Sequence, residues 1–382
     1  MTLAEILTNE ELRRHEFPVT REKIFLGHAG VCPLPRRVAQ AISDCANGGT
    51  LGDQEAFVLH RLNDARQAGA KLLNCQPDEV SLVGPTSLAL SFVAAGLNFR
   101  KGDNILIYHD DYPSNVYPWM ALAANGVQVR LLNTRSLGAV RVVDVIGQVD
   151  ENTRLVALAS CHFISGHRLE HDAIGKILRE RGILFCLDAI QTLGAFPTTV
   201  EHVDFLAADA HKWLLGPCGA GIFYVRRDLQ EKLNPPVYGW HNVRCPNYVA
   251  QEKIEFRSGA AKFEAGTHNL VGLLGLIAAM EFTLEIGVEN IAAELARKRA
   301  WLVPALQSKG FCVLNPGPKL ENVGGITSIF QPGKDLAPLH KKLAEAGVIA
   351  SLRTDRKGQN YIRLSPHFYN TDAELQRVLK LL

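Results

Sequence analysis

The sequence lacks the features that mark membrane, exported or nucleic-acid-binding proteins. Its longest strongly apolar stretches, around residues 88–97 and 270–280, are well short of the ~18 residues that a bilayer-spanning helix requires. It has no dense basic run, and its first residues lack the basic start and apolar middle of a signal peptide. Lys and Arg number 41 against 39 Asp and Glu. We therefore expect a cytoplasmic protein that spans no membrane and binds no nucleic acid.

Cysteine pairs of the CxxC type are also absent. The eight cysteines are scattered, and several lie inside apolar runs: Cys32, Cys45, Cys75, Cys161, Cys186, Cys218, Cys245 and Cys312. We expect buried thiols here rather than disulfides or a metal cluster.

The composition is that of a folded protein: 47% of residues are hydrophobic, 21% charged and 7% aromatic, which excludes disorder and a coiled-coil rod. A chain of 382 residues exceeds the usual single core of roughly 250–300 residues. We expect one large domain with a smaller companion.

Short apolar runs alternate with helical patterns through the first two-thirds of the chain. The runs cover residues 80–83, 104–108, 127–132, 154–160, 183–187, 205–208 and 222–225. Between them, residues 172–181 are typical of an amphipathic helix closed by Gly182. Apolar strands separated by helices indicate an α/β domain whose parallel sheet is covered on both faces.

From about Thr267 the pattern changes to a long helical stretch that reaches Ser308 and is interrupted near Gly287. Strand and helix patterns then alternate at residues 311–314, 325–330, 336–346, 348–352, 361–365 and from 372 onward. We therefore divide the chain into an N-terminal arm (1–20), a large domain (21–266), and a linker helix with a small α+β C-terminal domain (267–382).

Two residues in the middle of the chain are placed for chemistry. Asp188 follows an apolar run, at the carboxyl end of a predicted parallel strand, where ligand crevices form. Lys212 lies 24 residues later, between another apolar run and a Gly-rich segment. Taken alone, Lys212 could be a surface lysine and Asp188 a turn carboxylate.

The surrounding string, residues 185–225, reads FCLDAIQTLGAFPTTVEHVDFLAADAHKWLLGPCGAGIFYV. It resembles the pyridoxal-phosphate site of class V aminotransferases, which include cysteine desulfurases, selenocysteine lyases and isopenicillin N epimerase. Further motifs follow the family's order from about Leu26 to Leu382. The resemblance implies the PLP-dependent transferase fold of type I, with a mostly parallel seven-stranded sheet in the large domain. It also implies pyridoxal 5'-phosphate as cofactor, a small amino acid substrate and a homodimer with shared active sites.

In the family, the lysine of the HK pair forms the Schiff base, which assigns that role to Lys212; desolvation would help this lysine to lose its proton. Asp188 would pair with the pyridine nitrogen and keep the ring electron-withdrawing. Gln191 matches the residue that bonds the ring's phenolic oxygen, or is a plain exposed polar residue. Tyr112, in DYPSN, stands where desulfurases usually stack a histidine on the ring; a buried structural tyrosine is the alternative.

Thr86 and Ser87 follow a predicted strand and begin a helix, where hydroxyls, free N–H groups and the helix dipole suit a phosphate. An ordinary N-cap is the alternative. The resemblance adds His211 as a phosphate ligand. It also points to Asp209, where desulfurases often carry serine. A carboxylate there needs a proton, a bridging donor or a side chain that is turned away.

Thr267, in the FEAGT motif at 263–267, would reach the phosphate of the neighbouring subunit, or would cap the next helix. Arg363, in YIRLS at 361–365, matches the arginine that clamps the substrate α-carboxylate, for which a planar guanidinium is suited. We also assign His28 and Ser165 to substrate binding, although His28 could lie on the surface. His162 is as consistent with a structural role as with a functional one.

The same resemblance leaves the reaction open. Desulfurases use a cysteine on a mobile loop before the carboxylate-binding arginine, and no cysteine lies between Val348 and Arg363. Cys312 has an apolar strand pattern around it and is predicted to be core. We expect an aminotransferase-type enzyme that acts on a small α-amino acid through an external aldimine, with Lys212 as general base. The alternatives are β-elimination of the C–S lyase type, epimerisation, and a catalytically silent cofactor-binding dimer.

Overall fold

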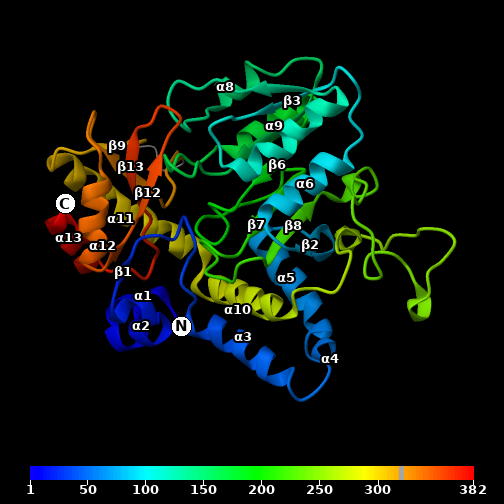
Figure 1. The fold of residues 1–382 in the computed structure, drawn as a ribbon, viewed down its shortest axis with the longest axis horizontal. Helices are drawn as coiled ribbons and strands as arrows, with labels where there is room; N and C mark the ends of the chain where they lie inside the picture. The colour runs from blue at the N-terminus through cyan, green and yellow to red at the C-terminus, as the bar shows by residue number, and fades with distance from the viewer. Residues whose placement is uncertain (318–321) are drawn as a thin grey trace.

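A computed structural model describes residues 1–317 and 322–382, and its centre is a seven-stranded sheet (Figure 1). The strands are ordered β2-β8-β7-β6-β5-β3-β4. Their bounds are β2 (Val80–Val83), β3 (Asn104–Ile107), β4 (Gln128–Leu131), β5 (Thr153–Ala159), β6 (Leu184–Asp188), β7 (Phe205–Asp209) and β8 (Gly221–Val225). Only β8 runs antiparallel to its two neighbours. The mostly parallel sheet is therefore confirmed.

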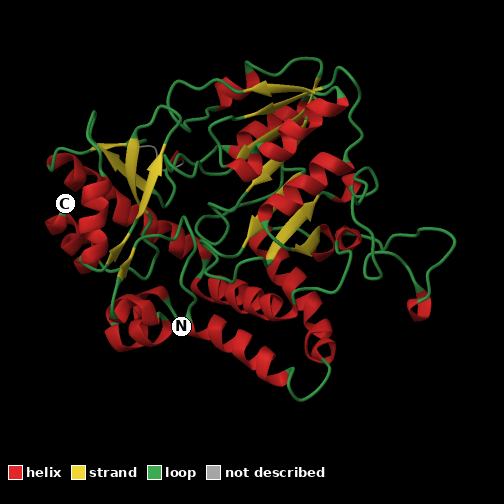
Figure 2. Cartoon of the chain, in the orientation of Figure 1, coloured by secondary structure: helices red, strands yellow, loops and turns green. Residues whose placement is uncertain are grey.

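Helices cover both faces of this sheet (Figure 2), because successive side chains on each apolar strand point to opposite sides. Leu106 belongs to one core cluster, while Ile105 and Ile107 belong to the other. The first cluster is covered by α3 (Arg36–Gly48), α4 (Gln54–Val58), α5 (Leu62–Leu73), α8 (Val142–Ile146), α9 (His171–Glu180) and α10 (Leu270–Ile286). The second is covered by α6 (Thr86–Gly96) and α7 (Tyr117–Met120).

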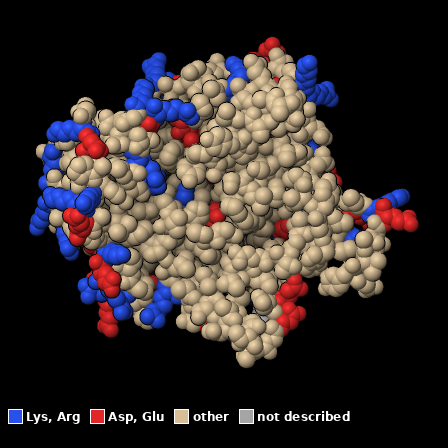
Figure 3. Space-filling view, in the orientation of Figure 1, with Lys and Arg blue, Asp and Glu red and all other residues tan. Residues whose placement is uncertain are grey.

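The C-terminal part is a four-stranded antiparallel sheet with helices, as the α+β pattern predicts. Its strands are ordered β12-β13-β10-β9. The elements are α11 (Val288–Ser308), β9 (Cys312–Val313), β10 (Thr327–Phe330), α12 (Ala337–Glu345), β11 (Val348–Ile349), β12 (Ser351–Thr354), β13 (Asn360–Leu364) and α13 (Asp372–Leu381). On the face shown in Figure 3, many of the exposed Lys and Arg side chains lie over this part.

The N-terminal segment packs against the C-terminal part, below it in Figure 1. It contains α1 (Leu3–Thr8), α2 (Glu10–Glu16) and β1 (Ile24–Phe25), and β1 pairs in parallel with β11. The Phe17 ring stacks on Tyr369 with 3.9 Å between centroids. Residues 24–25, which we predict to lie in the large domain, therefore pair with the C-terminal part. A strand of two residues is too short to show a hydrophobic periodicity, so the sequence pattern does not predict this pairing.

No single helix in the described ranges is long and apolar enough to cross a membrane; α10 and α11 would suffice together, but they are bent by 73° relative to each other. All eight cysteines are free, and four of them are buried: Cys32, Cys45, Cys161 and Cys186. The prediction that Cys312 is core is wrong, because Cys312 is exposed on the short strand β9 while its neighbour Val313 is the buried residue. The two side chains of β9 point to opposite faces of the sheet, and only that of Val313 faces the core.

Candidate active site

A cavity of about 320 Å³ lies where β6 and β7 end, between the large domain and the sheet of the C-terminal part. It brings together eight of the side chains selected from the sequence: Thr86, Ser87, Tyr112, Asp188, Gln191, His211, Lys212 and Arg363. Because these residues come from five separate segments, their meeting is a property of the fold and not of sequence proximity.

Lys212 is buried in this cavity, with 7% of its surface exposed. Its Nζ lies 5.2 Å from the centroid of the Tyr112 ring. Burial lowers the pKa of Lys212 to about 8, and the nearby Asp188 carboxylate opposes this shift. Lys212 is thus not a surface lysine, and a neutral, nucleophilic amine is accessible to it near neutral pH.

Asp188 ends strand β6 and is also buried. Its Oδ1 accepts a hydrogen bond from the Ile190 N–H (3.1 Å). Burial raises the pKa of Asp188 to about 6, while the Ile190 N–H and Lys212 lower it. A carboxylate held in this way is ready to pair with a cationic ligand group.

Asp111 is a buried acid beside Asp188 that sequence reasoning missed. Burial, followed by the Asp188 charge, raises the pKa of Asp111 to about 7. Its carboxylate accepts from the N–H groups of Tyr112 (2.7 Å) and Ala159 (3.1 Å) and from Asn115 Nδ2 (3.1 Å). It therefore ties the Tyr112 turn to the end of β5. Its position directly before Tyr112 was the available signal.

Tyr112 and Gln191 both face the cavity. Tyr112 is 45% exposed, so it is not a buried structural tyrosine. Gln191 is buried: its Oε1 accepts from Trp213 Nε1 (2.8 Å), and its Nε2 donates to the Ala29 carbonyl (3.1 Å). One N–H of the amide remains for a ligand, so the exposed polar alternative is wrong.

The N-terminus of α6 fits a phosphate group. Its N-cap residue is Pro85, whose side chain offers no hydrogen-bond acceptor to the first-turn N–H groups. Thr86 and Ser87 begin the helix and line the cavity together with His211. Unpaired N–H groups at the positive end of a helix, with hydroxyls and an imidazole beside them, suit a phosphate monoester.

Asp209 lies beside the N-terminus of α6 and does not line the cavity. Its Oδ2 accepts from the Gly219 N–H (3.1 Å), and its Oδ1 lies 3.1 Å from His211 Nδ1, although the two atoms are not aligned for a hydrogen bond. Its backbone N–H donates to Thr86 Oγ1 (3.0 Å). The carboxylate is thus turned away, and direct contact of Asp209 with a ligand in the cavity is not supported.

Neither His28 nor Ser165 lines the cavity, so the structure does not bring these two predicted substrate-binding residues together with the others. His28 is fully buried, with its Nε2 2.8 Å from the Tyr369 hydroxyl. Ser165 Oγ lies 3.1 Å from His162 Nδ1. Because this local bond turns Ser165 inward, Phe163 is the loop residue that faces the cavity.

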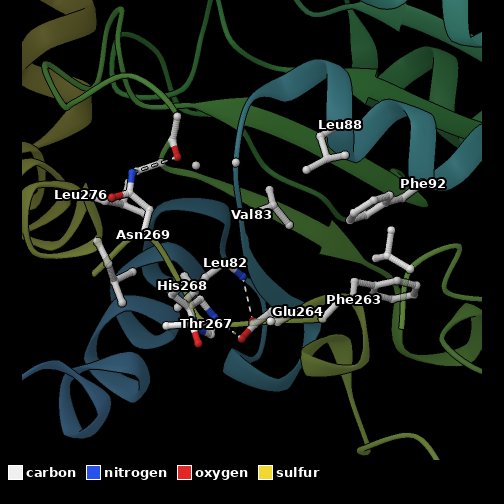
Figure 4. Close-up of a pocket in the computed structure, with 18 residues that line it drawn as sticks. Leu82, Val83, Leu88, Phe92, Phe263, Glu264, Thr267, His268, Asn269 and Leu276 are labelled. Carbon is white, nitrogen blue, oxygen red and sulfur yellow. Dashed lines mark hydrogen bonds and ion pairs between the residues drawn. The ribbon is translucent and has the colours of Figure 1, made fainter. Parts of the chain in front are cut away.

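Thr267 faces a second cavity of about 350 Å³, between the end of β2 and the start of α10 (Figure 4). It is exposed, and the residue that caps α10 is Asn269, whose side chain accepts from the Gly272 N–H. Beside Thr267, buried Glu264 accepts from the Leu82 N–H (2.8 Å). The N-cap alternative for Thr267 is therefore wrong.

Arg363 extends from β13 into the first cavity and is 1% exposed. Its guanidinium donates to the Phe163 carbonyl (2.7 Å) and to Ser351 Oγ (3.3 Å), and its buried Nε has no partner. Arg353 of β12 lines the same cavity and was missed by sequence reasoning. The signal was its place on a strand next to that of Arg363.

Comparisons with known proteins agree with this geometry. The family model described as aminotransferase class-V matches residues 24–378. A probable cysteine desulfurase from Methanothermobacter thermautotrophicus is 31% identical over 393 positions, covering 97% of this chain and 96% of the relative. The uncharacterized aminotransferase YcbU from Bacillus subtilis is 28% identical, with coverages of 97% and 96%.

Among solved structures, the apo cysteine desulfurase from Thermococcus onnurineus superposes with a TM-score of 0.89 at 23% identity, covering 97% of this chain and 96% of the other. That likeness establishes the fold of type I. The family match over most of the chain goes further: this protein belongs to the class V aminotransferase family and is a PLP-dependent enzyme.

Proposed function

We propose that this enzyme removes the α-proton of an α-amino acid with Lys212 and completes a transamination. The observation that carries the proposal is the meeting of three groups in one cavity: the buried amine of Lys212, the buried carboxylate of Asp188 and the guanidinium of Arg363. Pyridoxal phosphate, when bound, supplies the electron-withdrawing ring that acidifies the α-proton.

The remaining lining residues have roles that follow from their chemistry. We assign the first turn of α6, with Thr86, Ser87 and His211, to holding the phosphate. Asp188 would hold the ring nitrogen, Tyr112 would cover one face of the ring, and the free N–H of Gln191 would donate to a ring oxygen. Together these groups would fix the orientation of the cofactor relative to Lys212.

A substrate carboxylate would accept the hydrogen bond that the unpaired Nε–H of Arg363 is free to donate. The amine of Lys212 accepts the α-proton, since its lowered pKa leaves a neutral fraction near pH 7–8. Its burial keeps bulk water away from the proton that it holds. Lys212 could both hold this proton and give it back, so a transamination would need no other base.

Sulfur transfer to an enzyme thiol is not supported, since none of the described residues that line the cavity is a cysteine. The hairpin between β12 and β13 is tightly closed: the Gly358 N–H donates to the Asp355 carbonyl (3.0 Å), and the Lys357 N–H donates to Asp355 Oδ1 (2.9 Å). The second candidate is β-elimination, which the relatives named cysteine desulfurase favour and which uses Lys212 in the same way.

A panel of amino acids distinguishes these reactions. We would incubate the holoenzyme with each amino acid, with and without a keto-acid acceptor, and measure keto acid, ammonia, sulfide and optical rotation in parallel. Keto acid that forms only with the acceptor supports transamination. Ammonia or sulfide released without an acceptor assigns elimination, and loss of rotation alone assigns epimerisation.

Arg363→Ala is expected to raise KM for amino acids about a hundredfold, because a charge-assisted, buried contact to the α-carboxylate is lost. Steady-state kinetics would measure this, with cofactor content checked by absorbance. Arg363→Lys, which keeps the charge and loses the planar fork, should recover part of the affinity. An unchanged KM in Arg363→Ala would place the carboxylate elsewhere.

The rate at which the apoenzyme captures pyridoxal phosphate is expected to rise with pH, with a midpoint near 8. The reason is that only the neutral amine of Lys212 attacks an aldehyde, and burial lowers the pKa of Lys212 to about 8. Stopped-flow absorbance across pH 6–10 would follow the capture. A midpoint near the ordinary lysine value of 10.5 would contradict the desolvated site.

We also propose that the enzyme is a homodimer in which Thr267 serves the partner's site. Exposed apolar side chains on the segment that protrudes in Figure 1 support a subunit contact: Tyr238, Tyr248, Val249 and Ile254. Sedimentation should give twice the chain mass, and Tyr248→Glu should weaken the dimer. A monomeric, fully active wild type would refute the shared site.

A further inference from the structure

Arg353 and Arg363 lie on one face of the C-terminal sheet. In the antiparallel pairing of β12 with β13, Ser351 stands opposite Arg363, and Arg353 stands opposite Tyr361. Directly opposite residues share a face, and so do residues two apart along a strand. The two arginines are therefore diagonal neighbours, and both line the cavity that holds Lys212.

Neither arginine has a carboxylate partner among the described residues. Acids on the adjoining loops are engaged elsewhere. Asp110 pairs with Arg356, and Asp355 accepts from the Tyr361 hydroxyl (2.9 Å) and from the N–H groups of its own hairpin. The cavity thus holds two guanidinium groups, neither of them in ion-pair contact with a described carboxylate; Asp188 lines the same cavity but makes no ion pair with either.

The two groups differ in depth. Arg363 is 1% exposed, and its Nη atoms are committed to Phe163 and Ser351. Arg353 is partly exposed, and the neighbouring lining includes Tyr112 and Val31, which are 45% and 58% exposed. A carboxylate bound deep in the cavity on Arg363 leaves the charge of Arg353 nearer the mouth still unpaired.

We infer that Arg353 is a second anion-binding residue, which selects α-amino acids that carry another acidic group at the end of the side chain. A carboxylate or a sulfinate would suit it, because either presents two oxygens to a guanidinium fork. The inference rests on the proposed function in one respect: it takes Arg363 as the site of the α-carboxylate and Lys212 as the neighbour of Cα.

The test compares acidic and neutral amino acids of matched shape, aspartate with asparagine and glutamate with glutamine, and adds cysteine sulfinate with cysteine as a pair that differs in the acidic group. The enzymes are the wild-type holoenzyme, Arg353→Gln, and Lys357→Gln as a control. Lys357 is an exposed cation on the same hairpin that does not line the cavity. Its removal changes the net charge equally and leaves the subsite intact.

We expect wild type and Lys357→Gln to favour the acidic member of at least one pair in kcat/KM by about tenfold or more, the size of one charge-assisted contact. Arg353→Gln should lose that preference, so that the ratio of kcat/KM for the acidic member to kcat/KM for the neutral member falls to about one. If Arg353→Gln lowers kcat/KM for both members alike, both arginines hold the α-carboxylate and the inference is wrong. A wild type without preference also overturns it.

A binding measurement keeps the inference separate from the proposed function. Calorimetry would give the dissociation constants of succinate and butyrate for the same three holoenzymes. We expect succinate to bind more tightly than butyrate to wild type and Lys357→Gln, and about equally to Arg353→Gln. Equal affinities in wild type would refute the second anion site. Failure of every amino acid to react would refute the proposed function and leave this comparison informative.

Discussion

Lys212→Ala is expected to abolish covalent attachment of pyridoxal phosphate and to reduce turnover by about a thousandfold or more. Attachment requires a neutral amine at the carboxyl end of β7, and loss of a positioned base costs ~10²–10⁴ in rate. Borohydride reduction followed by intact-mass and peptide analysis would measure the attachment. Amino-acid turnover would be followed in the same preparation.

Lys357→Ala is the matched control, because it removes an exposed lysine and leaves the cavity unchanged. It should show the wild-type adduct at residue 212. Added methylamine should restore part of the turnover of Lys212→Ala if the lost group is a base. An adduct that persists in Lys212→Ala at a stoichiometry of one would move the attachment site to another lysine.

The burial of Lys212 also lowers the free energy of unfolding of the apoenzyme. Since burial lowers the pKa of Lys212 from 10.5 to about 8, keeping the amine charged in the folded apoenzyme costs ~3 kcal/mol at pH 7. This cost is present in full below pH 8 and disappears as the pH rises from 8 to 10.5. Lys212→Met should therefore raise the free energy of unfolding of the apoenzyme by up to about 3 kcal/mol at pH 7. Urea unfolding at pH 7 and pH 10 should show a smaller gain at the higher pH.

Asp188→Asn is expected to bind pyridoxal phosphate and yet to lose turnover by about a hundredfold or more. The asparagine side chain has the same shape and can still accept from the Ile190 N–H, but it has no charge to hold a protonated ring nitrogen. Cofactor stoichiometry by absorbance and kcat for the preferred amino acid would be measured together. Near-normal turnover would remove the electrostatic role of Asp188. Loss of cofactor would show that the carboxylate serves binding instead.

Much of the fold follows from the sequence because the inner strands of the large sheet, such as β6, β7 and β8, are apolar at nearly every position. Strand β6 is bounded by residues 184–188 where the apolar pattern predicts 183–187, and β8 by 221–225 where the pattern predicts 222–225. A strand buried on both faces must be apolar at nearly every position, so its first and last residues can be recognised from the sequence alone. The same rule fails for β9, an edge strand of two residues, and there the prediction for Cys312 fails.

The site was predictable where the backbone itself places a side chain. Asp188 and Lys212 could be assigned to the site because each lies at or shortly after the end of a strand. Thr86 could be assigned because it is the first residue of a helix. His28 and Ser165 lie in irregular segments, where hydrogen bonds to Tyr369 and His162 decide which way each side chain turns. Those partners are set by tertiary packing, so the pattern of the segment alone does not reveal them.

The parallel pairing of β1 with β11 has a consequence for the order of events during biosynthesis. Arg13 donates to the carbonyl of Tyr369, 356 residues further along the chain, and Ile24 pairs with Val348. Residues 1–26 are thus made early; Glu16 can already pair with Arg37 of α3, but β1 has no partner strand until the C-terminal part has been translated. The seven-stranded sheet can condense first, since its strands are close in sequence by comparison. Pairing of β1 with β11 must therefore come late in biosynthesis, and a chain shortened by its first 26 residues would leave β11 without the strand it pairs with.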